Sequence, residues 1–221
     1  MLRFFYKILP CQNLILFQTY ERLKKGMKFD MYNEKLIPLL DDLEDKDIEI
    51  AGGSTVGMVL SITNSLIKYI CNLTINKKKY ENVKNDVLNI KKEAKKLKIK
   101  VLKIIDKDKE ILEKILLAYK DRKENMEKYN ATCKEATEYC LEVTESALET
   151  LKLADRISKV GNKMLSSDFE ICKIYSYAAI KASIVNVDIN LGSIEDEIYN
   201  KSIKDKYVKI LEEAKNIYSN F

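Results

Sequence analysis

The residues with the clearest potential for chemistry are two aspartates, Asp106 and Asp108, in the segment "IIDKDKEILEKILLAY". Residues 79–119 carry an apolar side chain at every third or fourth position, which predicts one long amphipathic helix. Asp108 falls on that apolar stripe, where a carboxylate is costly to bury unless it is paired or hydrogen-bonded. Asp106 lies just beside the stripe. We predict a functional role for the pair; the structural alternative is that Asp108 pairs with a lysine or caps a break in its own helix.

Histidine is absent from the sequence. Proton transfer near neutral pH must then rely on Asp, Glu, Lys, Tyr, Cys or backbone groups. The commonest ligand of transition metals in proteins is also missing, so we expect no metal site.

A second feature is a pair of glycines and a serine that precede a long apolar stretch, which closes on "NKKKY". This pattern predicts a helix over 54–74 with Ser54 as its N-cap. Backbone N–H groups at a helix start attract anions, and lysines at the far end could hold a carboxylate. The alternative is plain helix architecture with solvated lysines. The helix would be about 30 Å long, so its two ends cannot both contact one small group.

A third feature is the interruption "KVGNKMLSSDFE". Gly161 and Asn162 predict the end of one helix. Ser167 and Glu170 form a capping-box pattern for the next helix. Asp168 would then lie in the first turn, where the helix dipole stabilises a carboxylate.

Around these features, the sequence predicts an all-α fold. With two prolines, six glycines and no strand pattern in 221 residues, we expect a single-domain bundle of about six helices, two of them long. The predicted helices span 33–45, 54–74, 79–119, 126–158, 168–187 and 194–219. Gly57, Ser61 and Ser65 recur every four residues, which predicts a close helix contact in the core or across a dimer.

Charge and composition exclude several classes of protein. The net charge is +5, but residues 1–30 hold six Lys and Arg against two Asp and Glu, so the remainder is nearly neutral. Its charges are interleaved, and we expect no nucleic-acid partner. Eight Ser, Thr or Asn residues make 54–74 too polar for a membrane span, so no membrane partner is expected. There is no P-loop and no dinucleotide-binding motif.

Five cysteines without a C-x-x-C pair indicate reduced thiols and a cytoplasmic protein. Residues 1–30 differ from the remainder: their apolar run is interrupted and lacks a small-residue cleavage site, which argues against a signal peptide. We interpret residues 1–30 as an N-terminal extension before a natural start at Met27 or Met31, and residues 31–221 as the domain.

Several stretches together resemble one known family. They are "AGGSTVGMV", "NLTINKKKYEN", "IIDKDKEILEKILLAY", "GNKMLSSD" and "ASIVNVDINLGSI". In order and separation they are similar to the pattern of the formiminotransferase-cyclodeaminase C-terminal domain family, over residues 31–215. The resemblance implies an all-α homodimer with its active site near the subunit contact.

Members of that family act on one-carbon tetrahydrofolates. The resemblance favours a stand-alone methenyltetrahydrofolate cyclohydrolase, which hydrolyses 5,10-methenyltetrahydrofolate to 10-formyltetrahydrofolate, because no formiminotransferase domain accompanies the sequence. One alternative is a formiminotetrahydrofolate cyclodeaminase, which releases ammonia. Others are a catalytically silent folate-binding or interaction protein of the same fold and a purely structural helical dimer. The implied partner is the folate substrate, with or without a polyglutamate tail, and no bound cofactor is implied.

The resemblance also assigns roles to residues. Its D-x-D motif falls on Asp106 and Asp108, which would do acid–base work, and its Ser-Asp helix start adds Asp168 as a catalytic candidate. The glycine turn and the lysines would seat the pterin and the glutamate tail. Substrate-binding roles fall on Gly52, Gly53, Ser54, Lys77, Lys78, Tyr80, Ser167, Asn186 and Asn190.

The chain departs from the family pattern in three places. Ile50 and Ala51 replace the proline and the first glycine of an opening Pro-Gly-Gly-Gly-Ser. If that glycine needs a positive φ, alanine there is strained, which favours the silent alternative. Asn76 replaces a common glycine, and Cys140 stands where many members have a proline that would kink the helix.

Overall fold

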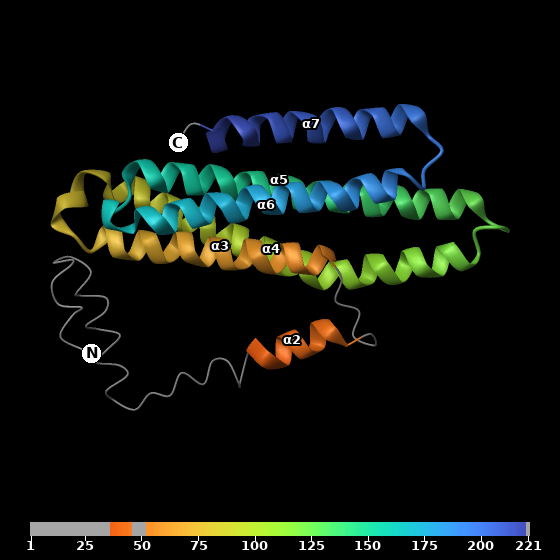
Figure 1. The fold of residues 1–221 in the computed structure, drawn as a ribbon, viewed down its shortest axis with the longest axis horizontal. Helices are drawn as coiled ribbons and strands as arrows, with labels where there is room; N and C mark the ends of the chain where they lie inside the picture. Colours follow the sequence, from red (N-terminus) through yellow and green to blue (C-terminus); the bar gives the residue numbers. More distant parts are fainter. Residues whose placement is uncertain (1–35, 46–51, 220–221) are drawn as a thin grey trace, which may run out of the picture. The chain divides into compact units, whose positions relative to one another are not determined.

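A computed structural model describes residues 36–45 and 52–219 of the chain. The chain divides into two units, Met1–Glu49 and Ile50–Phe221, and each is described by itself. The described residues form six α-helices and two short 3-10 helices and contain no strand (Figure 1). The predicted all-α bundle with two long helices is therefore confirmed.

In the first unit the structure describes one short helix, α2 (Ile37–Glu44). Pro38 lies in its first turn, where the missing N–H costs no helical hydrogen bond. Residues 33–35 of the helix expected over 33–45 lie outside the described residues. The expected extension, residues 1–30, does so as well.

The second unit is a bundle of long helices. Four of them pack together: α3 (Gly52–Ile75), α4 (Lys84–Lys120), α5 (Met126–Val160) and α6 (Ser166–Leu191). Helix α7 (Glu197–Ser219) lies along α5 and α6 (Figure 1). The 3-10 helix η3 (Lys78–Val83) joins α3 to α4, and η4 (Lys163–Leu165) precedes α6. Helices α4 and α5, of 37 and 35 residues, extend past the start of α3 (Figure 1).

Helix α4 forms because its apolar stripe packs on the bundle, as its periodicity predicts. The buried positions of that stripe are Val87, Ile90, Ala94, Leu97, Val101, Ile104 and Ile111. The polar break expected at 120–125 separates α4 from α5. Asn125 caps α5, because its side chain accepts a hydrogen bond from Lys128 N at 3.0 Å.

Helix α3 is the central helix and packs against α4, α5 and α6. By length and composition alone it could cross a membrane, a test that buried core helices also pass. Thr63, Ser65 and Thr74 satisfy their hydroxyl groups within the helix, since each donates to the carbonyl four residues earlier. The buried hydroxyl of Ser61 has no hydrogen-bond partner among the described residues. Asn64 is fully buried and donates from Nδ2 to Thr150 Oγ1 on α5 at 3.0 Å. These bonds allow polar residues in the core.

The small residues of α3 bring it close to α4. Gly57 is buried, and a Cβ built on it would lie 2.5 Å from Ile105 Cγ1. Ser61, one turn later, is also buried. The close contact was expected either in the core or across a dimer, and at Gly57 it lies in the core.

The start of α6 differs from the prediction. Leu165 is the N-cap and makes no side-chain capping bond, so the capping box expected from Ser167 and Glu170 is wrong. Asp168 does lie in the first turn of α6. The preceding helix ends at Gly161 as predicted.

The end of α6 also differs. A helix was expected over 168–187, but α6 continues to Leu191. Asn186 and Asn190 therefore lie inside the helix, one turn apart on the same face.

Substitution of Gly57 tests the close contact between α3 and α4. We expect Gly57→Val to lower stability by about 1–3 kcal/mol, because the new side chain overpacks Ile105. Gly52→Val is the matched control, since a Cβ there meets nothing within 4 Å. Thermal melting measures both. Equal melting temperatures for the two variants would show that α3 and α4 are not in close contact at Gly57.

Candidate functional site

Asp108 on α4 reaches the first turn of α3. Its Oδ2 accepts hydrogen bonds from Ser54 N at 2.7 Å and from Ser54 Oγ at 2.8 Å. N–H groups of a first turn lack partners in their own helix and carry partial positive charge, so the carboxylate satisfies them and is stabilised by them. The prediction that Ser54 is the N-cap is wrong: Ser54 lies inside α3. Asp108 thus caps the start of α3 from the neighbouring helix, while α4 itself continues without a break through residue 108.

Gly53 provides the space for this carboxylate. A Cβ built on Gly53 would lie 2.8 Å from Asp108 Cγ and 2.9 Å from Asp108 Oδ2. At Gly52 the same test finds nothing within 4 Å. Of the two glycines, only Gly53 is required to be small by the structure around it.

Side chains from α5 and α6 complete the surroundings of Asp108. Burial and the negative charge of Asp108 raise the pKa of Tyr139. Burial and the same charge raise the pKa of Cys140 to about 12. Asn190 on α6 donates from Nδ2 to Cys140 Sγ at 3.5 Å. We call this set the carboxylate cluster: Gly53, Ser54, Asp108, Tyr139, Cys140 and Asn190.

The other two candidates near this end of the bundle differ in exposure. Asp106 is exposed on a different face of α4 from Asp108. Asn186 is half-buried on α6, one turn before Asn190.

The predicted tyrosine and lysines lie at the opposite end of α3. Tyr80 Oη lies 3.4 Å from Asn162 Oδ1 and accepts a hydrogen bond from Lys163 N at 3.1 Å. Asn162 N donates to Thr74 Oγ1, in the last turn of α3, at 3.0 Å. The α3–α4 connection and the α5–α6 connection are thereby tied together.

Four further candidates lie at this end of the bundle, two at the start of the α3–α4 connection and two in the first turn of α6. Lys77, Lys78 and Ser167 are exposed, and Lys77 Nζ lies 3.6 Å from Met164 Sδ. Asp168 is half-buried, and burial raises its pKa. We call this second set the junction cluster: Lys77, Lys78, Tyr80, Asn162, Ser167 and Asp168.

The two clusters are far apart within one chain. Helix α3 has 24 residues and is therefore about 36 Å long. The carboxylate cluster lies at its start and the junction cluster at its end. The structure thus brings Gly53, Ser54, Asp108 and Asn190 together, but it separates them from the candidate lysines and from Asp168.

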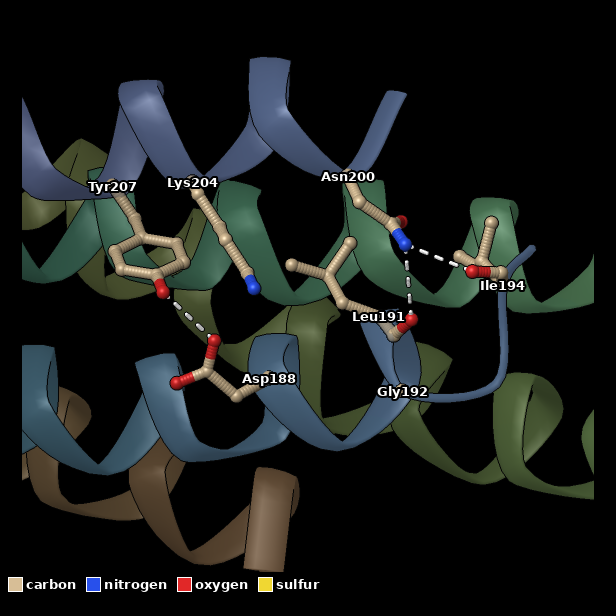
Figure 2. Close-up of a pocket in the computed structure, with 7 residues that line it drawn as sticks. All are labelled: Asp188, Leu191, Gly192, Ile194, Asn200, Lys204 and Tyr207. Atoms are coloured by element: carbon tan, nitrogen blue, oxygen red, sulfur yellow. Dashed lines mark hydrogen bonds between the residues drawn. The ribbon is translucent and has the colours of Figure 1, made fainter. Parts of the chain in front are cut away.

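A cavity of about 600 Å³ lies between α6 and α7, and no residue of either cluster lines it (Figure 2). Its lining residues are Asp188, Leu191, Gly192, Ile194, Asn200, Lys204 and Tyr207. Tyr207 Oη donates to Asp188 Oδ1 at 2.8 Å, and Asn200 Nδ2 donates to Ile194 O at 2.8 Å (Figure 2). These bonds fasten α7 to the end of α6, so we interpret the cavity as a packing seam. None of the predicted site residues lines it.

Sequence reasoning missed three residues of these clusters, Tyr139, Cys140 and Asn162, of which Cys140 was noted only as a departure from the family pattern. Tyr139 is one of 13 tyrosines and lies in an ordinary helical pattern. A signal was present, because a tyrosine on a core-facing position needs a partner for its hydroxyl. Asn162 was expected only to end a helix, yet its side chain also accepts from Met164 N. In the described part of the chain, no group of three or more Cys, Asp or Glu side chains is placed to hold a metal ion.

Comparison with known proteins identifies the chain. Residues 35–209 match the family described as formiminotransferase-cyclodeaminase. The chain belongs to this family. One relative of this chain is the methenyltetrahydrofolate cyclohydrolase of Methylorubrum extorquens. It is 24% identical over 189 residues, which cover 82% of this chain and 91% of that protein.

A solved structure supports the same fold. It is that of the formiminotetrahydrofolate cyclodeaminase from Thermotoga maritima, with a TM-score of 0.77 at 24% identity. The match covers 82% of this chain and 90% of that one. The family resemblance inferred from the quoted stretches is confirmed.

Of the three departures from the family pattern, two lie in described residues. Asn76 occupies the turn after α3, and α5 continues as one helix through Cys140. Ile50 and Ala51 lie outside the described residues.

Substitution of Gly53 tests the position of Asp108. We expect Gly53→Ala to displace the carboxylate and break its bonds to Ser54, so that α3 loses its cap. Gly52→Ala is the control, since both variants gain the same helix propensity. Gly53→Ala should be less stable than Gly52→Ala by about 1 kcal/mol, the usual effect of losing an N-cap. Coincident denaturation curves for the two variants would contradict the contact.

Proposed function

We propose that this family member is a methenyltetrahydrofolate cyclohydrolase, which converts 5,10-methenyltetrahydrofolate to 10-formyltetrahydrofolate. The observation that carries the proposal is the carboxylate of Asp108, fixed at the start of α3 by both donors of Ser54. The name of the Methylorubrum relative and membership of the family support a folate substrate. A chain without histidine can do this chemistry, because carboxylates suffice for it.

The methenyl bridge is an amidinium cation, so its carbon is electrophilic. A nearby carboxylate stabilises the cation and accepts a proton from the attacking water. The water oxygen bonds to the bridge carbon, the bond from that carbon to N5 breaks, N5 takes up a proton, and one proton is released overall. We assign the base to Asp108. Asp106 and Asp168 are the candidates for the acid, and the raised pKa of Asp168 favours it, since a protonated carboxyl is needed.

The exposed face of α6 supports the homodimer that we propose with this function. A helix of a lone bundle normally turns polar residues to solvent. Helix α6 instead exposes an uncharged stripe at helical spacing. Its members are Ile171, Tyr175, Ala178, Ala182, Val185 and Ile189. The exposed fractions of Val185 and Ile189 are 56% and 66%, which are high for apolar side chains. A second copy of the chain would cover this stripe.

Such a dimer would unite the two clusters. With a twofold axis perpendicular to α6, the two stripes run antiparallel, so the start of one α6 lies beside the end of the other. The start of α6 carries Asp168 and the junction cluster, and its end carries Asn190 and the carboxylate cluster. Each site would then combine Asp108 of one subunit with Asp168 of its partner. Lys77 and Lys78 would hold the glutamate tail of the folate.

The second candidate function is that of a cyclodeaminase, favoured by the structural match to the Thermotoga protein. The same carboxylates would protonate the departing ammonia.

The four described cysteines are free and buried, which supports a cytoplasmic location.

Turnover by the purified full-length chain tests the proposal. We expect loss of the absorbance of 5,10-methenyltetrahydrofolate, and a drop of roughly 10²-fold or more in Asp108→Asn, as for loss of an acid–base group. The control is Asp205→Asn, an exposed carboxylate on α7 that should leave the rate unchanged. Ammonia release from formiminotetrahydrofolate, without methenyl hydrolysis, would favour the cyclodeaminase. Folate binding without either reaction would show a silent member.

A further inference from the structure

Tyr139 is attached to the turn of α4 that carries Asp108. Tyr139 is 3% exposed, and its hydroxyl donates to Ile104 O at 2.7 Å. In an α-helix the carbonyl of residue 104 also accepts the N–H of residue 108. The hydroxyl of Tyr139 therefore binds the same backbone group that holds Asp108 in the helix.

The phenol also lies against the Asp108 side chain. Burial above all, and then the negative charge of Asp108, raise the pKa of Tyr139. The phenol thus keeps its proton in the range where enzymes work and remains a donor. Lys107 Nζ lies 5.6 Å from the centre of the Tyr139 ring and adds a cation–π contact on the same turn.

We propose that Tyr139 is a positioning residue for Asp108. Ser54 fixes the carboxylate from α3, and Tyr139 fixes the backbone turn from α5, so Asp108 is held from two sides. The catalytic consequence rests on the proposed function, whereas the positioning itself does not. Without the hydroxyl, the Ile104–Asp108 turn keeps only its helical bonds, and the carboxylate is less well oriented toward the reacting carbon.

The test is Tyr139→Phe, which keeps the ring and removes the hydroxyl. Its matched control is Tyr199→Phe, because the hydroxyl of Tyr199 also lies against α5, 3.3 Å from both Lys134 O and Glu138 Oε1, away from Asp108. We expect kcat of Tyr139→Phe to fall about tenfold with KM unchanged, the effect of one lost hydrogen bond. Tyr199→Phe should keep the wild-type kcat. In an Asp108→Asn background, Tyr139→Phe should cause no further loss.

Hydrogen exchange separates this inference from the proposed function. Amides of residues 104–108 and 52–55 should exchange faster in Tyr139→Phe than in Tyr199→Phe, whether or not the chain is active on folates. An inactive wild type would overturn the proposed function alone. Unchanged exchange in those segments would overturn the positioning role. A wild-type kcat in Tyr139→Phe would also overturn the positioning role. So would a tenfold fall in kcat when Tyr139→Phe is added to Asp108→Asn.

Discussion

The bond between the Asp108 carboxylate and the first turn of α3 is the interaction on which the rest of the structure depends. It solves two problems at once, because a carboxylate on an apolar stripe needs donors and a helix start needs acceptors. It also sets the approach of α3 to α4, which is close enough that neither Gly53 nor Gly57 has room for a Cβ. The proposed catalytic group is therefore part of the fold, and its substitution affects both stability and activity.

Much of this arrangement could be predicted from the sequence, because the 3.6-residue period shows which side chains share a face. That period places Asp108 on the inner face of α4 and leaves Asp106 outside it. What Asp108 contacts could not be predicted, since its partner Ser54 lies 54 residues away. The capping patterns at Ser54 and Ser167 failed for the same reason. Local sequence cannot show that a carboxylate from another helix caps the start of α3 in place of Ser54. Nor can it show that a 3-10 turn precedes α6 in place of a capping box.

The separation of the two clusters follows from helix length. A helix as long as α3 cannot present both of its ends to one ligand, so the family's candidate residues do not form one site within a single chain. Only the assembled bundle shows that one apolar face of α6 has no neighbour among the described residues. An antiparallel pair of subunits would cover that face and complete both sites together.

The most direct test is the activity of a mixed dimer. Co-expression of Asp108→Asn and Asp168→Asn chains with different tags allows the heterodimer to be purified, along with the two homodimers. If each site combines Asp108 of one subunit with Asp168 of the other, the heterodimer has one intact site and should show about half of the wild-type turnover, while both homodimers are inactive. A heterodimer as inactive as the homodimers, or a chain that does not dimerise at all, would contradict the account.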